Sequence, residues 1–345
     1  MVNFDCFYQG VSMKALAVTV LGLGMSAAIS GSLTTQIPGS LWVANDNSAQ
    51  VAIGPIPVGN TTPAQPSWAV VQWSTRDPLY SPGPFKYPYN SLPYSSFSGS
   101  NDNWLLSNST AAVKYDKVTA PWLNGVYTLA LNGVPTLACG DEYDLFLQPK
   151  TDSLNSYGPN ANGAPLGLTN SKPLSQLTAL QFNLGAEITY ESITYKCPNQ
   201  PISDYNNASY TLGIVLQNSQ TNKFFFYQIT FRDARINDPN DLGDDFAGFT
   251  DGVSVGVGDS IRRISPNSQI LKPNGGRVAY GGIDILPRLK TVISRGWIQS
   301  PGGQIFNFSG NLSEWRVKGV FIGNIIYGGA TVSSSWDNFS LVETP

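Results

Sequence analysis

The sequence contains no histidine. This absence excludes catalytic triads with a histidine base, and metal or haem sites with imidazole ligands. Charged residues are also scarce, at 12% of the 345-residue chain, against about 25% in an average soluble domain. The net charge of −3 comes without a block of Lys and Arg. Nucleic acid is therefore not an expected partner, because its binding needs clustered positive charge.

Long hydrophobic runs are missing as well. The apolar stretch from Ala15 to Met25 is shorter than the ~20 residues that a membrane-spanning helix needs. It follows Met13 and Lys14 and leads to small residues, a pattern typical of a signal peptide cut between Ala28 and Gly31. A membrane anchor is the competing interpretation. We expect residues 1-30 to be an upstream extension and a signal peptide, and the mature chain to be secreted, extracellular or at the cell surface, without a membrane span.

Cysteine is rare in the expected mature chain. Cys6 precedes the signal, which leaves Cys139 and Cys197 as an even pair in an oxidising compartment. A disulfide between them would close a loop of about 58 residues and stabilise the fold by about 4 kcal/mol in the chain-entropy model. A reactive thiol is the alternative interpretation.

Turn-forming residues and short apolar runs indicate a β protein. Residues 31-103 are expected to form an irregular segment with edge strands, in which Arg76 to Asn103 is a loop or linker rich in Pro, Tyr and Ser. Residues 104-345 are expected to form one β-sandwich domain. The strands expected there include 112–115, 126–131, 145–147, 278–285, 291–298, 315–322 and 331–341. No helical pattern of sufficient length is evident.

Two segments carry the clearest strand patterns. Between Gln181 and Tyr190, alternate residues form one apolar face, made of Phe182, Leu184, Ala186, Ile188 and Tyr190. Tyr210 to Gln217 and Lys223 to Arg232, joined by a short polar turn, predict an antiparallel hairpin. The predicted fold class is all-β, an antiparallel two-sheet β-sandwich of the jelly-roll type.

Aromatic and hydrogen-bonding side chains share one face of this hairpin. Sugars combine flat C–H faces with hydroxyl groups, so such a face suits a carbohydrate ligand. The candidate ligand-binding residues are Phe224, Phe226, Gln228, Arg232, Asn183, Trp104 and Trp122. Core packing is the competing interpretation for each tryptophan.

Carboxylates supply two further kinds of candidate. A calcium ion would take oxygen ligands from the Asp-rich turn that contains Asp241 and Asp245, although its spacing is not that of an EF-hand and a solvated turn is the alternative. Hydrolysis of a glycosidic bond would need two flanking carboxylates. Glu187, on the polar side of its strand, and Glu142 are the catalytic candidates, with solvated surface acids as the competing interpretation. No other cofactor is expected.

Two passages carry a family resemblance. Tyr-Thr-Leu-Gly-Ile-Val-Leu-Gln (210 to 217) with Phe-Phe-Phe-Tyr-Gln-Ile-Thr-Phe (224 to 231), and Trp-Arg-Val-Lys-Gly-Val-Phe-Ile-Gly (315 to 323) with Trp-Asp-Asn-Phe-Ser-Leu (336 to 341), resemble the concanavalin-like jelly rolls, most nearly glycoside hydrolase family twelve, the secreted endoglucanases. The family's two catalytic glutamates do not carry over, because the matching places hold Phe226 or Gln228, and Gly323-Asn324-Ile325. The resemblance of the last strand to carbohydrate-binding jelly rolls also makes Asp337 a candidate ligand for a structural calcium ion.

The leading hypothesis is an exported, non-catalytic β-sandwich that binds a polysaccharide or a cell-surface glycan. One alternative is a secreted glycoside hydrolase that uses a different carboxylate pair. Another is a structural or adhesive subunit of the cell surface, which the low charge and the Tyr- and Pro-rich loop also fit. An acid-active peptidase is compatible with the composition, but no motif indicates one.

Overall fold

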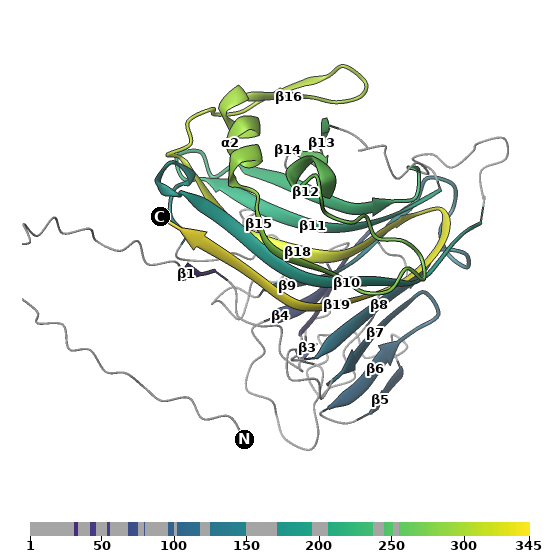
Figure 1. Cartoon of the computed structure of the whole chain (residues 1–345). Coiled ribbons are helices and arrows are strands. Elements are labelled where there is room, and N and C mark those ends of the chain that lie inside the picture. The colour runs from purple at the N-terminus through teal and green to yellow at the C-terminus, as the bar shows by residue number, and fades with distance from the viewer. Residues whose placement is uncertain are drawn as a thin grey trace, which may run out of the picture.

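Two large β-sheets packed face to face make up the body of the molecule (Figure 1). The computed structural model describes residues 31–33, 42–45, 54–55, 68–74, 79, 96–99, 102–117, 125–149, 171–194, 206–236, 245–250 and 255–345. The predicted all-β, two-sheet sandwich is confirmed. Below, the inner face of a sheet is the one turned toward the other sheet, and the outer face is the one turned away from it.

The eight-stranded sheet has the order β15-β10-β19-β8-β7-β6-β5, with β1 paired to β19. Its pairings are all antiparallel. The strands are β1 Gly31–Ser32, β5 Ser96–Gly99, β6 Asn103–Ser107, β7 Ala111–Asp116, β8 Val126–Asn132, β10 Ala179–Thr194, β15 Val278–Asp284 and β19 Gly329–Thr344.

The nine-stranded sheet has the order β13-β14-β12-β11-β18-β9-β4-β2-β3. Its pairings are antiparallel except for β12 with β14 and β2 with β4, which are parallel. The strands are β2 Trp42–Asn45, β3 Gly54–Pro55, β4 Trp68–Trp73, β9 Glu142–Pro149, β11 Asn207–Asn218, β12 Phe224–Asp233, β13 Asp245–Thr250, β14 Val255–Ser260 and β18 Trp315–Tyr327. Residues 31-103 thus contribute β1 and β5 to the eight-stranded sheet and β2, β3 and β4 to the nine-stranded sheet. β5 lies within the segment from Arg76 to Asn103 that was expected to be a loop or linker, and its pairing with β6 corrects that expectation.

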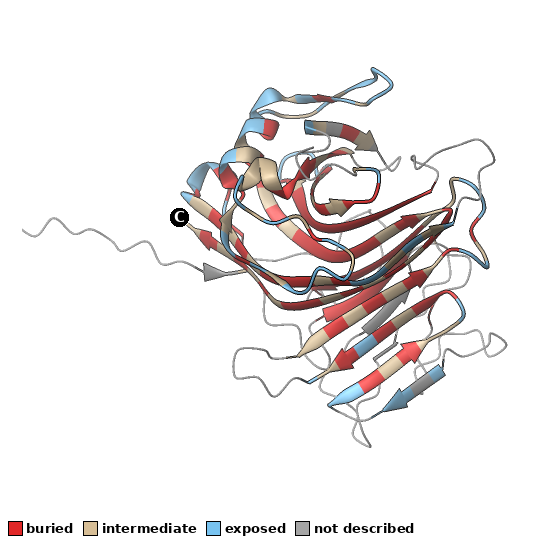
Figure 2. Ribbon diagram, turned by 45° about the vertical axis from the view of Figure 1, so that its right-hand side comes forward, coloured by how far each residue is buried: buried red, intermediate tan, exposed pale blue. Residues whose placement is uncertain are grey.

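The core lies between the inner faces of the two sheets. Its largest fully buried side chains include Trp68, Tyr127, Tyr210, Phe231 and Trp336. Buried positions alternate with more exposed ones along β8, as expected for a strand with one face in the core (Figure 2). Hydrophobic burial of this extent is the main stabilising contribution to such a fold.

The two clearest strand predictions are confirmed, with one local difference. β10 buries Phe182, Leu184, Ala186 and Ile188, but Tyr190 is 50% exposed. The pairing of β10 with β19 shifts register between Ile188 and Tyr190, and an extra residue in one strand turns the following side chains to the other face. The predicted apolar face of β10 therefore ends at Ile188.

Two helices correct the expectation of a chain without helix. α1 spans Ile261–Ile264 and α2 spans Leu286–Arg295, and a 3-10 turn covers Leu174–Gln176. The predicted strand 291–298 is wrong, because most of it lies in α2 and only its end belongs to the short β16. α2 has Pro287 in its first turn and ends at Gly296 in the left-handed conformation, which are typical helix start and stop signals.

The last part of the fold is a small hairpin beside α2. Its strands are β16 Trp297–Gln299 and β17 Ile305–Asn307.

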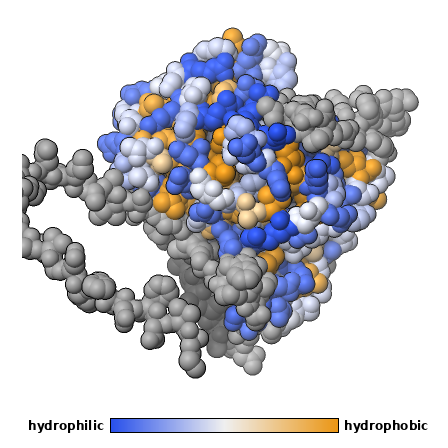
Figure 3. All heavy atoms as spheres, viewed as in Figure 1, coloured by the Kyte–Doolittle hydropathy of each residue, from blue (hydrophilic) through white to orange (hydrophobic). Residues whose placement is uncertain are grey.

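In the view of Figure 1, hydrophobic residues gather at the centre of the molecular surface and hydrophilic ones surround them (Figure 3). Among the described residues, no helix is long and apolar enough to cross a membrane.

Candidate functional site

A row of aromatic side chains crosses the outer face of the nine-stranded sheet. Along β9, Tyr143, Leu145 and Leu147 point into the core, so the alternate residues Asp144, Phe146 and Gln148 lie on the outer face. Phe146 belongs to a hydrophobic cluster separate from the core. The aromatic members of this cluster, here called the aromatic row, are Trp73 of β4, Phe146 of β9, Phe321 of β18, and Phe224 and Phe226 of β12.

Ring contacts join the row across the sheet. The ring centroids of Trp73 and Phe146 are 5.0 Å apart, those of Phe146 and Phe321 are 4.7 Å apart, and those of Phe321 and Phe226 are 6.0 Å apart. Tilted and T-shaped pairs at these distances are favourable arrangements of aromatic rings. Trp73 and Phe226, at the two ends of this chain of contacts, are half-buried, whereas Phe146 and Phe321 between them are buried.

A glycine makes room for the middle of the row. Gly213 of β11 lies directly opposite Phe321 in the sheet. A Cβ atom on Gly213 would lie 1.9 Å from the Phe321 ring, a separation that no real pair of carbon atoms tolerates. The missing side chain therefore allows the Phe321 ring to lie flat over β11 and extend the row toward β12.

Two carboxyl groups lie at one end of the row. Asp144 is 6% exposed and lies between its cross-strand neighbours Trp73 and Ile325. Glu142, two residues earlier in β9, lies on the same face. Burial in these apolar surroundings raises the pKa of the Asp144 carboxyl well above its usual range, and the negative charge and hydrogen bond of Glu142 raise this pKa further. The folded protein therefore holds the proton of Asp144 more tightly than an exposed aspartate would.

Other polar groups extend this end of the face. Tyr327 of β18 lies opposite Glu142, and the pKa of its hydroxyl is raised by burial and then by Glu142 and Asp144. At the end of β12, Asp233 is buried and bound by Arg235, whose Nε donates to Asp233 Oδ1 at 2.9 Å. Asp233 is thus neutralised by a neighbouring cation.

Polar atoms without hydrogen-bond partners flank the middle of the row. Asp144 Oδ1 and Gln148 Oε1 are buried and make no hydrogen bond with the described part of the chain. These two residues lie on either side of Phe146 along β9. A buried polar atom that lacks a partner costs about 1–3 kcal/mol, so such atoms indicate where a water molecule or a ligand hydroxyl would be bound.

The structure places the predicted ligand-binding residues at different locations. Phe224, Phe226 and Gln228 lie on the outer face of β12, as predicted. Trp104 lies in the core, 2% exposed, and its ring contacts those of Tyr115 and Tyr127. Trp122 lies outside the described residues.

Arg232 points into the interior, unlike its predicted partners on β12. Its register partner on β11 is the core residue Tyr210. The Arg232 Nε atom donates to Glu191 Oε2 at 2.9 Å, and its Nη2 atom donates to Glu191 Oε1 at 2.6 Å. Glu191 belongs to β10, so this ion pair joins the two sheets.

The two catalytic candidates are not brought together. Glu142 belongs to the nine-stranded sheet, whereas Glu187 lies on β10 of the eight-stranded sheet, opposite Ser335. Asn183 is on that same strand, where it donates to Ser340 Oγ at 3.0 Å and accepts from the Gly282 amide at 2.9 Å. Glu187 and Asn183 are therefore remote from the aromatic row.

The carboxylates predicted as calcium ligands have cationic partners where they are described. Arg277 binds both oxygens of Asp337, with its Nε 2.7 Å from Asp337 Oδ2. Asp245 accepts from Arg288 at 2.6 Å, and Asp241 lies outside the described residues. Among the residues that are described, no three carboxylate or thiol side chains are grouped so that they could hold a metal ion.

Cys197 lies outside the described residues, so the disulfide between Cys139 and Cys197 stays a prediction.

Sequence reasoning missed Trp73, Phe146 and Phe321. Part of the signal was present, because Asp144, Phe146 and Gln148 alternate with apolar residues along their strand. The missing information was the register, which brings β4, β9, β18, β11 and β12 side by side from distant parts of the sequence.

No family model matches the chain, and neither does any curated protein sequence. Solved structures to which it is similar include a cellulase derived from Cel12A of Rhodothermus marinus, 9% identical over 70% of this chain and 91% of that chain, with a TM-score of 0.36. The native family 12 xyloglucanase from Bacillus licheniformis is 12% identical over 72% of this chain and 99% of that chain, with a TM-score of 0.36. The family 11 xylanase from Neocallimastix patriciarum is 9% identical over 74% of this chain and 93% of that chain, with a TM-score of 0.29. Family 12 enzymes are thus among the similar structures. At these identities the likeness concerns the arrangement of strands, and the function is argued below from this chain's own residues.

Proposed function

We propose that the protein is an exported carbohydrate-binding protein and that the aromatic row is its binding surface. The observation that carries the proposal is the combination, on one sheet face, of half-buried rings at Trp73 and Phe226 with unpartnered polar atoms at Asp144 and Gln148. Sugar rings stack their C–H faces on aromatic side chains, while their hydroxyl groups need hydrogen-bond partners. The carboxyl groups of Asp144 and Glu142 at one end of the face disfavour an anionic ligand, so the proposed ligand is a neutral polysaccharide.

Binding without hydrolysis is the better-supported form of this proposal. A glycosidic bond is cleaved by two carboxyl groups ~5 Å apart or ~6.5–9.5 Å apart. Glu142 and Asp144 lie within hydrogen-bonding distance of each other, and Asp233, three strands from β9 at a spacing of ~4.8 Å per strand, is bound by Arg235. The positions that match the family's glutamates hold Phe226 and Gln228 on this face, and Asn324 points into the core, where it donates to the Leu129 carbonyl.

Retention on insoluble polysaccharides tests this surface. The Trp73→Ala and Phe226→Ala variants should each weaken retention by about 10-fold or more, because each removes a stacking platform. Gln148→Met should also weaken it but should leave the thermal stability unchanged or higher, since a buried polar atom without a partner is replaced by an apolar group. Tyr190→Ala is the matched control, because Tyr190 is an exposed aromatic residue on the other sheet. Equal retention of all four variants would contradict the proposal.

Hydrolysis remains a second candidate because of one observation. A carboxyl group with a raised pKa beside an aromatic platform is suited to donate a proton to a glycosidic oxygen, and Asp144 beside Trp73 has this arrangement. Release of reducing ends from soluble glycans at pH 4 to 7, lost in folded Asp144→Asn, would favour this candidate. Retention without release would favour binding alone.

Export is part of the proposal and has its own test. Residues 1–30, which lie outside the described residues, are proposed to contain the signal, so the mature protein should begin between Ala28 and Gly31. Mass spectrometry of the intact protein from the culture supernatant checks the cleavage site. The same spectrum, before and after reduction, should show a gain of about 2 Da for one disulfide, proposed between Cys139 and Cys197. A chain that keeps its first 30 residues in the membrane fraction would contradict export.

A further inference from the structure

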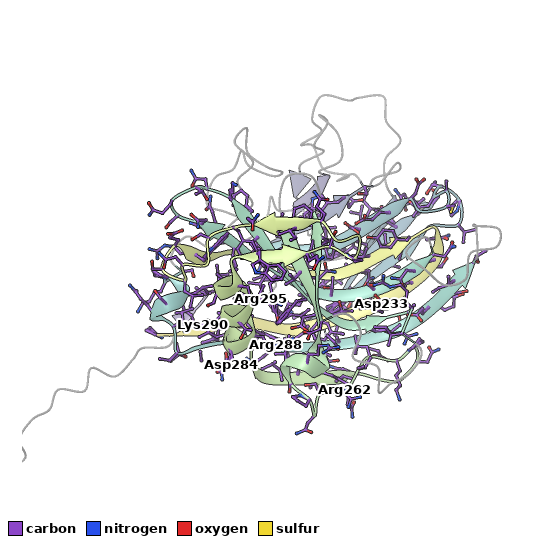
Figure 4. The ribbon with its side chains drawn as sticks, turned by 90° about the horizontal axis from the view of Figure 1, so that it is seen from above. Asp233, Arg262, Asp284, Arg288, Lys290 and Arg295 are labelled. Carbon is purple, nitrogen blue, oxygen red and sulfur yellow. The ribbon has the colours of Figure 1, made fainter. Side chains whose placement is uncertain are left out.

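Positive charge is concentrated in one part of this acidic chain. Seven of the 20 Lys and Arg residues lie between Ile261 and Arg295, a segment that holds a single carboxylate, Asp284. Figure 4 shows Arg288, Lys290 and Arg295 on α2, with Asp284 at the start of the helix and Asp233 well apart from them. The region around α2 is therefore the place where an anionic ligand would meet a favourable local potential.

Most of these cations already have partners. Arg277 is paired with Asp337, and Arg288 is paired with both Asp245 and Asp259. Lys290 donates to the Leu177 carbonyl at 2.8 Å. Arg295 is exposed and, among the described residues, has neither a carboxylate nor a carbonyl partner. Within the part of the chain that the structure describes, its five N–H donors are free for a ligand.

Two aromatic rings hold the Arg295 guanidinium group. Its Cζ atom lies 5.1 Å from the centroid of the Trp297 ring and 5.7 Å from that of Phe246. Cation–π contacts of this kind fix the position of a guanidinium group without using its hydrogen-bond donors. Arg295 is thus placed in advance for a planar anion such as a carboxylate, which it can bind through two parallel hydrogen bonds.

The hairpin beside Arg295 presents a surface that suits a sugar ring. Trp297 is 40% exposed and Ile305 is 56% exposed. Both lie on the same face of the hairpin as Gln299 and Asn307, because Trp297 pairs with Asn307 and Gln299 pairs with Ile305. Ile298 and Phe306 point to the opposite face. An exposed indole with amide side chains beside it offers stacking and hydrogen bonds to one ligand.

We propose that Arg295 and Trp297 form a binding site for a sugar residue that carries a carboxylate, a hexuronate, within an acidic glycan. Trp297 would stack on the sugar ring and Arg295 would bind the carboxylate. This site lies at the α2 and β16 side of the molecule and does not depend on the aromatic row, so either site can exist without the other. A sulfated sugar shares the anionic chemistry, and the test below separates the two.

Titration calorimetry of the purified mature protein with oligosaccharides of equal length tests the site. The ligands are an oligogalacturonate, its neutral methyl ester, a sulfated neutral oligosaccharide and a cello-oligosaccharide. We expect the oligogalacturonate to bind best. Arg295→Gln and Trp297→Ala should each weaken its binding by about 10-fold or more. Arg295→Lys should keep only part of the wild-type affinity, because lysine keeps the charge but cannot donate two parallel hydrogen bonds to the carboxylate.

Control variants identify the source of any effect. Lys114→Gln removes an exposed cation of β7 that is paired with Asp116, and it should leave the affinity for oligogalacturonate unchanged. Trp73→Ala should also leave it unchanged, whereas it should weaken retention on neutral polysaccharide, so failure of the aromatic row and failure of this site are distinguishable. Equal affinity for the acid and its methyl ester, no binding of either, or preference for the sulfated ligand would overturn the hexuronate proposal.

Discussion

The Arg232→Met variant is expected to lose about 3–5 kcal/mol of unfolding free energy, because the change leaves the Glu191 carboxylate buried without its partner. The Glu191 side chain is only 7% exposed and the Arg232 side chain 17% exposed, so water cannot replace the lost contacts. Tyr210, whose hydroxyl lies near Glu191, would be left facing an unpaired charge. Chemical denaturation at neutral pH measures the loss.

A double substitution separates the ion pair from simple packing. Glu191→Leu combined with Arg232→Met removes both charges and keeps apolar volume, so most of the lost stability should return. Lys117→Met is a comparison variant that should cost little stability, because Lys117 pairs with Asp102 and both side chains are more than half exposed. An Arg232→Met protein of normal stability that no longer binds polysaccharide would contradict the structural role and assign Arg232 to the ligand.

The Asp144→Asn variant is expected to be more stable than the wild type at pH 8, by about 1–3 kcal/mol, and equal to it near pH 4. The folded protein raises the pKa of Asp144, chiefly through burial, so the folded state holds this proton more tightly than the unfolded state. The contribution of Asp144 is thus fully present below the ordinary aspartate pKa of ~3.9 and is lost as the pH rises toward the raised value. Asparagine resembles the protonated carboxyl group and does not titrate.

The measurement is the difference in unfolding free energy between variant and wild type at pH 4, 6 and 8. Using this difference cancels the contributions of the other carboxylates, which titrate in both proteins. Glu142→Gln should act in the same direction but less, because the charge of Glu142 is the smaller cause of the raised pKa. A difference that does not change with pH would show that Asp144 titrates normally in the folded protein.

Strand alternation and the hairpin were sufficient to predict the sandwich, because each depends on neighbouring residues. The faces of β10 and of the β11–β12 hairpin follow from residues within a few positions of one another. The helix α2 was missed although its apolar positions Leu286, Leu289, Val292 and Ile293 have helical spacing, because the β-branched residues at 291–293 favour a strand. Pro287 and Gly296 were the features that favoured a helix.

The site could be predicted only where one strand carries it. Phe224, Phe226 and Gln228 share a face of β12, so their common orientation follows from the period of two. Arg232 seemed to share that face, but the pairing of β11 with β12 shifts register next to Tyr210, and the shift turns Arg232 inward toward Glu191. Sequence alone gives no sign of such a bulge, nor of the order of strands that places Phe146 beside Phe321.

The pairing of the first and last strands has a consequence for how the molecule can be rearranged. Gly31 pairs with Glu343 in the eight-stranded sheet, so these two residues, far apart in the sequence, lie side by side. A short linker could join the chain at these two points, and new ends could be opened in the tight turn after Asn218, with the sheets left intact. A segment attached before Gly31 and one attached after Glu343 would then leave the sandwich at the same corner, away from the aromatic row.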